Sequence, residues 1–224
     1  MSEWWTYRPS DFLMFAPRTY WRLFELQNEA WWPAQAVFSA LVLALVIGLW
    51  RSHAPGPRAG VIGFAFAWAC VAFSFLWQRY APVNWAASGF AWAFGLQALG
   101  LLALAMQHTV RVTGSSWRRH IGLGLLLWAV LAHPLLPFAF NRPWMQAEVI
   151  GLAPDPTAIA TLGLLLVIDA RPRALRWALC AAAYAWLLAS AATLATMGAA
   201  QAVVPLGALL LASVALWRAR CSPG

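Results

Sequence analysis

The sequence predicts an all-α, polytopic membrane helix bundle with about seven transmembrane helices and an amphipathic N-terminal surface segment. Of its residues 62% are hydrophobic and 10% are charged, whereas a soluble domain carries about 25% charged residues. The apolar residues come in blocks of about 16 to 24, the length that crosses a hydrocarbon core of roughly 30 Å. All fifteen basic residues are arginines, and they lie in the gaps between these blocks.

The N-terminal segment, residues 1–31, mixes aromatic side chains with Arg18, Arg22, Glu25 and Glu29. It is amphipathic, and it contains no apolar run long enough to cross a bilayer. Indole rings suit the headgroup boundary, where they bury an apolar body and hydrate a polar N–H. We therefore expect one or two helices lying on the outer surface of the membrane.

The predicted transmembrane bundle, residues 32–217, consists of apolar segments rich in Ala, Leu, Gly and Trp. Such compositions are typical of helices that pack together in lipid. Pro33 suits the first turn of the first segment. We expect seven spans: 32–50, 60–78, 86–107, 120–140, 148–169, 175–196 and 199–217.

The fifth span is the weakest of the seven. Only about fourteen residues separate Pro156 from Asp169, which corresponds to about 21 Å of helix. Starting the span at Glu148 restores its length but places Pro154 and Asp155 inside it. Two interpretations stay open. The helix is broken there, as in transporters that expose backbone to a substrate, or a short helix starts with Asp155 as its N-cap.

The arginines alternate between the connections on the two sides of the bundle. Ten fall on one side: Arg51, Arg58, Arg111, Arg118, Arg119, Arg171, Arg173, Arg176, Arg218 and Arg220. Five fall on the other: Arg8, Arg18, Arg22, Arg79 and Arg142. The positive-inside rule then predicts an outer N-terminus and a cytoplasmic tail, 218–224. Topology alone explains the inner arginines, although they could also hold anionic lipid headgroups.

Two motifs carry a resemblance to a known family. They are Phe24, Asn28 and Trp32-Pro33-Ala34-Gln35, and Gln78-Arg79-Tyr80 followed by Asn84-Trp85. With these motifs the chain resembles, over its whole length, an uncharacterised family of small bacterial polytopic inner-membrane proteins known by a domain-of-unknown-function label. The resemblance implies a multi-pass topology in a bacterial inner (plasma) membrane. It implies no activity, so no catalytic residue is transferred.

Composition and motifs argue against several classes of protein. Retinal proteins need a lysine for their Schiff base, and this chain has none. The arginines form no single patch and accompany no nucleic-acid motif, so we expect no nucleic-acid partner. The four histidines, His53, His108, His120 and His133, share no helical face at i, i+4 spacing. We therefore predict neither a metal site nor a cofactor.

Polar side chains gather at the predicted outer ends of the spans. Ionisable groups at membrane depth are costly, so their presence there points to function. Arg79 could pair with Glu29 or Asp155 as a structural brace, or it could bind an anionic group bidentately. The candidate binding residues are Glu29, Gln78, Arg79, Tyr80, Asn84, His133, Glu148 and Asp155.

These observations favour small-molecule or ion transport or binding through an outward-facing polar vestibule. The alternative is a non-catalytic accessory or assembly subunit of a larger membrane complex. An intramembrane enzyme acting on lipid-like substrates is less favoured, because no nucleophile–base pair is evident. The expected partners are membrane lipids and either further copies of the chain or a larger membrane complex. If the protein is a transporter, we expect the outer polar groups to converge on one water-filled cavity. If it is a scaffold, we expect them to pair locally.

Overall fold

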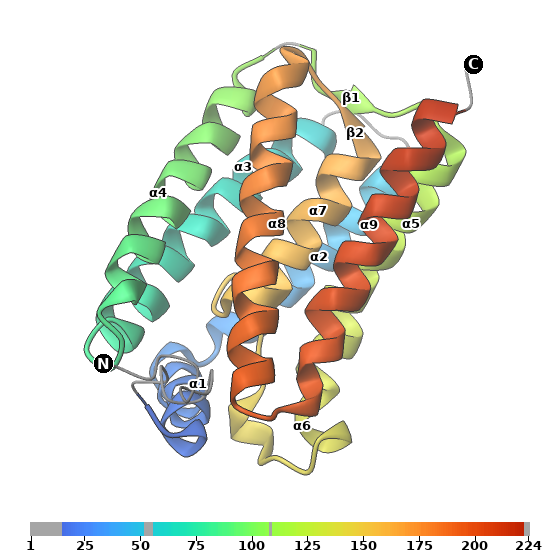
Figure 1. Ribbon diagram of the computed structural model, residues 1–224. Coiled ribbons are helices and arrows are strands. Elements are labelled where there is room, and N and C mark those ends of the chain that lie inside the picture. The colour runs from blue at the N-terminus through green and yellow to red at the C-terminus, as the bar shows by residue number, and fades with distance from the viewer. Residues whose placement is uncertain (1–14, 52–55, 108, 222–224) are drawn as a thin grey trace, which may run out of the picture.

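The protein is a polytopic membrane helix bundle (Figure 1). The computed structural model describes residues 15–51, 56–107 and 109–221. Within these residues, five helical segments are long and apolar enough to cross a membrane. They are Gly56–Tyr80, Ala86–Ala105, Ser116–Ala139, Arg173–Thr196 and Ala200–Arg218. Their boundaries lie within four residues of the spans predicted from the sequence.

Three of these five segments change their helical pitch along the way. The first joins α3 (Gly56–Cys70) to a π-helical stretch, Val71–Tyr80. The third runs through α5 (Ser116–Leu127), π-helical Trp128–Ala132, 3₁₀-helical His133–Leu135 and α6 (Leu136–Ala139). Pro134 has no N–H to continue the α-helical ladder, which accounts for the change of pitch there. The other segments are α4 (Ala86–Ala105), α8 (Arg173–Thr196), and 3₁₀-helical Ala200–Ala202 with α9 (Val203–Cys221).

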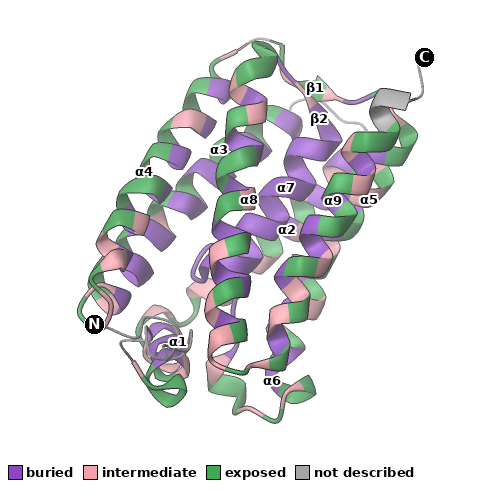
Figure 2. Ribbon diagram, in the orientation of Figure 1, coloured by how far each residue is buried: buried purple, intermediate pink, exposed green. Residues whose placement is uncertain are grey.

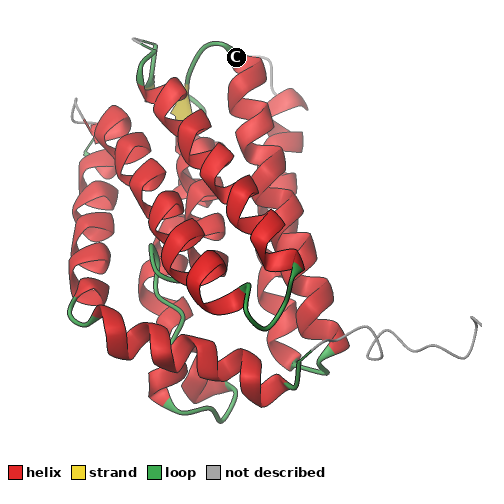
Figure 3. Ribbon diagram, turned by 90° about the vertical axis from the view of Figure 1, so that its left-hand side faces the viewer, coloured by secondary structure: helices red, strands yellow, loops and turns green. Residues whose placement is uncertain are grey.

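The N-terminal helices are arranged as a bent pair. The axes of α1 (Pro17–Trp31) and α2 (Ala34–Trp50) differ by 88°, and α1 runs crosswise at the end of the bundle (Figure 3). Its buried side chains recur at helical spacing and form one face. They are Tyr20, Leu23, Phe24 and Gln27. The sequence-predicted amphipathic segment is therefore a helix lying across one end, while its first fourteen residues lie outside the described ones.

The predicted fifth span, 148–169, is shorter in the structure. Helix α7 (Pro154–Val167) has 14 residues, begins at Pro154 and continues without a break. The residue at its N-cap is Ala153, and Asp155 lies in the first turn. The structure thus has the short helix and not the broken one. Among the described residues, five helical segments are long enough to cross a membrane, or six if the bent pair is one span, so the predicted number of about seven is approximate.

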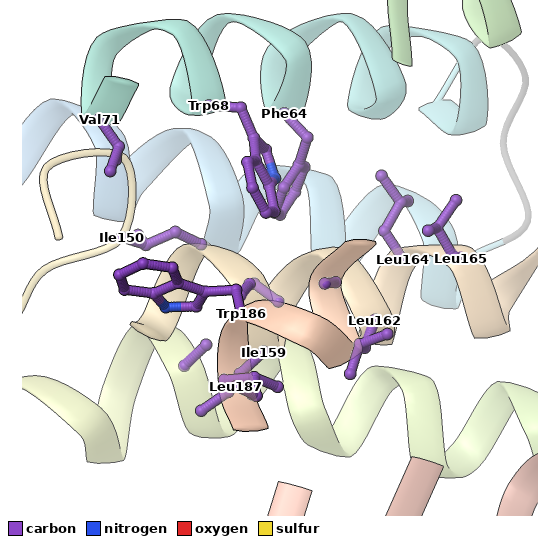
Figure 4. Packing of buried hydrophobic residues seen from close by; sticks show 14 of the residues in the cluster. Phe64, Trp68, Val71, Ile150, Ile159, Leu162, Leu164, Leu165, Trp186 and Leu187 are labelled. Atoms are coloured by element: carbon purple, nitrogen blue, oxygen red, sulfur yellow. The ribbon is translucent and has the colours of Figure 1, made fainter. Parts of the chain in front are cut away.

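Helix α7 is the centre of the bundle, and every one of its residues is buried (Figure 2). A helix that is apolar on all sides requires such an environment. Aromatic and aliphatic side chains of α3 and α8 point toward it, among them Trp68 and Trp186 (Figure 4). The indole N–H of Trp68 donates to Thr161 Oγ1 at 2.7 Å, so a polar contact between helices accompanies the apolar packing.

The crossing of α5 and α7 depends on two glycines. A methyl group added at Gly122 would come within 2.5 Å of the carbonyl oxygen of Gly163, and one added at Gly163 within 2.6 Å of that of Gly122. Small residues allow such close approach of membrane helices. At one end of this crossing, β1 (Arg111–Val112) pairs antiparallel with β2 (Ile168–Asp169), which directly follows α7.

The helix directions place the arginines at two ends of the molecule. The arginine-rich end contains the C-terminus of α2, the β1–β2 pair and the N-termini of α5 and α8 (Figure 1). The α1 end contains α1, the turn after Tyr80 and the connection 140–153 that leads into α7. The candidate residues named from the sequence lie at or near the α1 end.

Candidate functional site

The connection 140–153 is fastened to α1 by side-chain hydrogen bonds. Asn28 Nδ2 donates to the carbonyl oxygens of Met145 and Ala147, each at 2.8 Å. Gln146 Nε2 donates to Glu25 Oε1 at 2.7 Å. These contacts fix a segment with little regular structure beneath α1. They thereby position the charged side chains that this segment carries into the bundle.

Glu148 is the carboxylate that the connection places inside, and 2% of the residue is exposed. Gln201 Nε2 donates to Glu148 Oε1 at 2.5 Å. Arg142 Nη2 lies 3.8 Å from the same oxygen and also donates to Gln201 Oε1. The guanidinium of Arg142 lies over the Trp21 ring, 3.5 Å from the ring centroid, which adds a cation–π contact. Glu148 is thus held by one amide and one nearby cation.

Asp155 lies close to this pair, in the first turn of α7, and 1% of the residue is exposed. Trp186 Nε1 donates to its Oδ1 at 2.8 Å, and Ser190 Oγ donates to its Oδ2 at 2.6 Å. Both donors come from α8. A carboxylate at a helix N-terminus is also stabilised by the helix dipole. Asp155 and Glu148 are near enough for each charge to act on the other.

His133 is fully buried beside them, and its ring faces the backbone of Glu148. Neither ring nitrogen makes a hydrogen bond of good geometry within the described residues. The same holds for Nε and Nη1 of Arg142. Buried polar groups normally have partners, so unpartnered ones require an explanation. We call Arg142, Glu148, Asp155 and His133 the buried ionisable cluster.

The environment of Glu148 favours its protonated form. Burial raises the pKa of Glu148 well above its usual range, and the charge of Asp155 raises it further. The charge of Arg142 and the hydrogen bond from Gln201 act in the opposite direction but do not outweigh burial. One of the two carboxylates is therefore poised to hold a proton.

Arg79 forms an ion pair with neither Glu29 nor Asp155 among the described residues. Its Nε donates instead to Gln27 Oε1 at 2.6 Å, and Gln27 Nε2 donates to Ser74 Oγ at 2.8 Å. Sequence analysis did not identify Gln27. Its place on the buried face of α1, at helical spacing from the apolar residues of that face, is the signal that could have found it.

The other candidates lie outside the cluster. Tyr80 is buried in an aromatic group with Tyr20 and Phe75. Asn84 Oδ1 accepts from the backbone N–H of Ala86 at 3.1 Å, at the start of α4. Glu29 and Gln78 are exposed, and Glu29 borders a mainly apolar groove of about 500 Å³. Of the eight candidates, the structure brings together His133, Glu148 and Asp155.

One further partner of the site, Gln201, was not predicted from the sequence. Gln201, which bridges Arg142 and Glu148, lies in the turn before α9 and carries no local signal of its role. Within the described residues, no three His, Cys, Asp or Glu side chains are placed to hold a metal ion. His53 and His108 lie outside the described residues.

The fold and this site define a polytopic membrane helix bundle with ionisable groups buried among its helices. Residues 18–220 match the model of a family of unknown function, DUF6064, and the chain belongs to that family. The resemblance to an uncharacterised family is thereby confirmed, while its bacterial setting stays a prediction. No curated protein and no solved structure matches the chain significantly.

Proposed function

We propose that the protein transports or binds small molecules or ions across or within the membrane, and that its buried ionisable cluster binds a proton. One observation carries this proposal: His133, Glu148 and Asp155 are buried near one another with the partly buried Arg142, and polar atoms of His133 and Arg142 have no partner among the described residues. Ionisable groups buried in a membrane protein are expensive, and they typically mark ion or proton pathways.

The proton is the ligand that best fits this geometry. Between 0% and 2% of His133, Glu148 and Asp155 is exposed, so a larger solute finds no room beside them in this structure. A proton needs no cavity. With both carboxylates ionised and the imidazole neutral, the cluster carries one net negative charge. A single proton cancels that charge, which lowers the cost of keeping the cluster out of water.

We place the outward-facing vestibule in a second conformation of the protein, in which α1 has moved away from the bundle. Helix α1 and the connection 140–153 cover the cluster, and they are held together by hydrogen bonds from Asn28 and Gln146. Movement of α1 away from the bundle would open a path to Glu148 from the α1 end. We propose that a solute or ion enters by this path, and that protonation of Glu148 accompanies its passage.

Proton movement into liposomes tests the proposal. The purified protein is reconstituted with a pH-sensitive dye inside the vesicles, and a membrane potential is imposed. We expect acidification with the wild type and its loss in Glu148→Gln, because an amide cannot carry a proton. Glu29→Gln is the matched control, since Glu29 is an exposed carboxylate at the same end and lies outside the cluster. Equal acidification by wild type and Glu148→Gln would refute the proposal.

Infrared titration of the same proteins gives a readout that does not depend on transport. A protonated carboxyl group absorbs separately from a carboxylate. We expect this band to persist at neutral pH in the wild type and to disappear in Glu148→Gln, because burial raises the pKa of Glu148. A wild type without the band at neutral pH would contradict the proposed proton site.

An accessory or assembly subunit is the second candidate function. It is favoured by the local pairing of Asp155 with Trp186 and Ser190, which resembles a structural brace. Large aromatic side chains also remain exposed, such as Trp85 and Trp92. An accessory subunit should co-purify in fixed stoichiometry with one membrane complex whose amount falls when the gene is deleted. It should show no proton movement by itself.

The sidedness of the protein is part of the proposal. Because arginines are concentrated at one end, we expect that end and the C-terminus to face the cytoplasm. A C-terminal fusion to a reporter that is active only in the cytoplasm should give a signal, and a fusion to one that is active only outside should not. The opposite pattern would reverse the assignment.

A further inference from the structure

A cavity of about 770 Å³ lies at the arginine-rich end, opposite the buried ionisable cluster. Its walls come from the β1–β2 pair, the N-terminal parts of α5 and α8, and the last turns of α9, which meet there (Figure 1). Half of its ten lining residues are arginines, and one is an acid: Arg111, Arg118, Arg171, Arg173 and Arg176, with Asp169. From the sequence these arginines were explained by topology, with anionic lipid headgroups as the alternative, and topology alone does not require them to share a cavity.

Two of these arginines are built into the wall. Arg118 is 8% exposed and Arg176 is 6% exposed. Arg118 donates from Nη1 to Asp169 Oδ1 at 2.8 Å and from Nη2 to the carbonyl of Ile168 at 3.0 Å. Arg176 donates from Nη1 to the carbonyl of Leu165 at 3.1 Å. These bonds hold both guanidinium groups at the edge of the bundle interior. Arginines that only set the membrane topology would not need to be buried there.

Each of the two buried guanidinium groups has an N–H donor that makes no hydrogen bond in the described part of the chain. The Nε atoms of Arg118 and Arg176 have no hydrogen-bond partner within the described part of the chain. A buried N–H without a partner costs free energy unless a ligand or water supplies an acceptor. The cavity next to them is the place from which an acceptor can come.

The charges around the cavity are unbalanced. Asp169 is the one acid among its lining residues, and its carboxylate already accepts from Arg118. Five arginines therefore face one carboxylate that is already engaged. Like charges held together repel one another, and a multiply charged anion would remove that repulsion. A phosphate group carries about −1.5 to −2 charges and several acceptor oxygens, which suits planar guanidinium donors.

The walls of the cavity are held in place before any ligand arrives. Thr109 Oγ1 donates to the carbonyl of Arg171 at 3.2 Å, and the N–H of Arg171 donates back to Thr109 Oγ1 at 2.8 Å. The N–H of Thr113 donates to the carbonyl of Val167 at 2.8 Å. A site that is already ordered loses less entropy when a ligand binds.

We propose that this arginine-lined cavity is a binding site for a phosphate group, presented either by a lipid headgroup or as a free phosphate anion. Trp177 and Leu216 give the cavity an apolar side, which would suit the part of a lipid next to its phosphate. Arg118 and Arg176 bind the phosphate from the interior, and the exposed Arg171 and Arg173 bind it from the mouth.

Calorimetric titration of the full chain in a phosphate-free, uncharged detergent tests the site. The probes are inorganic phosphate and dihexanoyl phosphatidic acid, with dihexanoyl phosphatidylcholine as the zwitterionic comparison. We expect the wild type to bind a phosphate probe. Arg176→Gln should weaken that binding about tenfold or more, as expected for a lost hydrogen bond between charged groups.

The double variant Arg171→Gln/Arg173→Gln keeps the test decisive if Arg176→Gln does not fold. Both side chains are exposed, so the bundle does not depend on them, and binding should still weaken severalfold. Arg58→Gln is the matched control, because it removes one exposed arginine at the same end but outside the cavity. Glu148→Gln should bind the probes like the wild type, which separates this site from the proposed proton site.

The two probes distinguish the source of the phosphate. Much tighter binding of phosphatidic acid supports a lipid headgroup, and equal binding of both probes supports a free phosphate anion. The proposal is overturned if the wild type binds neither probe. It is also overturned if Arg58→Gln weakens binding as much as Arg171→Gln/Arg173→Gln, because general surface charge would then explain the affinity.

Discussion

The two ends of the molecule differ in how far their charges are balanced by partners. At the α1 end, Glu148 and Asp155 are buried and accept from neutral donors, and the partly buried Arg142 lies beside Glu148. At the arginine-rich end, five arginines share a cavity with a single acid. Buried charge is stable only when it is nearly balanced, whereas surplus charge of one sign needs water or a counter-ion. At the α1 end a single proton is enough to balance the charge, whereas the arginine-rich end has several positive charges in surplus.

The largest effect should follow from unbalancing the α1 end. Arg142→Met leaves the buried negative charge shared by Glu148 and Asp155 without its cation, and we expect the free energy of unfolding to fall by about 3 to 5 kcal/mol. Denaturant unfolding in detergent measures it. A second change, Glu148→Gln, should restore part of the loss, because only Asp155 then carries a charge without a cation, and Trp186 and Ser190 donate to it. Arg22→Met is the control, because 55% of that side chain is exposed. A small loss in Arg142→Met, comparable to the control, would mean that the pair is not electrostatically coupled.

The pH dependence of stability should differ in sign between the carboxyl groups of the two ends. Burial raises the pKa of Glu148, so the folded state binds the proton more tightly than the unfolded chain. Its contribution is present below the unfolded pKa and is lost as the pH rises through the folded pKa. Glu148→Gln should therefore gain stability relative to wild type in alkaline buffer but not in acidic buffer.

Asp169, at the other end, should show the reverse. Burial by itself would raise its pKa, but hydrogen bonds from Arg118 and Thr113 and the nearby arginine charges lower the pKa of Asp169 below its usual value. Its contribution is present above the unfolded pKa and is lost as the pH falls through the folded pKa. Asp169→Asn should be less stable than wild type at neutral pH, with the difference vanishing in acid. Melting curves of both variants across pH check the two signs.

A smaller effect should follow from removing one donor to Asp155. Trp186→Phe keeps an aromatic ring against Phe90 and Phe94 but deletes the indole N–H. We expect a loss of about 1 to 2 kcal/mol, since Ser190 still donates to the carboxylate. Trp92→Phe is the matched control because that indole is 70% exposed. Equal losses in both variants would show that the hydrogen bond to Asp155 contributes nothing measurable.

The smallest effect on stability should come from the mouth of the arginine-lined cavity. Arg171→Gln/Arg173→Gln removes two exposed charges from a surface with surplus positive charge, so we expect a change within about 0.5 kcal/mol. Any change should be an increase at low salt, because repulsion among the remaining arginines falls. A large loss of stability would show that these arginines hold the fold together and would remove the contrast between the two ends.

Local sequence features were enough to predict much of the fold. Helix length and composition predicted the long spans, because crossing a bilayer imposes a minimum length on every helix. The prolines also predicted a short helix in this region, but its N-cap is Ala153 and not Asp155, as the sequence suggested. The π-helical stretch Val71–Tyr80 has no such signal, because its pitch depends on how neighbouring helices pack.

The candidate site was harder to predict because its contacts join distant segments. His133, Glu148 and Asp155 were predicted as candidate site residues because ionisable residues are rare in apolar segments. Their partners are ordinary amides and an indole, such as Gln201 for Glu148 and Gln27 for Arg79. These pairs lie about fifty residues apart in sequence, so periodicity within one segment carries no information about them.

Because α7 is buried on all sides, its burial has a consequence for the order in which the helices enter the membrane. At 14 residues it is about 21 Å long, shorter than the roughly 30 Å of hydrocarbon it would have to cross alone. It also carries Asp155 in its first turn, whose desolvation a lipid environment would not offset. Its donors, Trp186 and Ser190, are synthesised only afterwards. We therefore expect helix α7 to reach its final depth only once α8 has emerged from the ribosome.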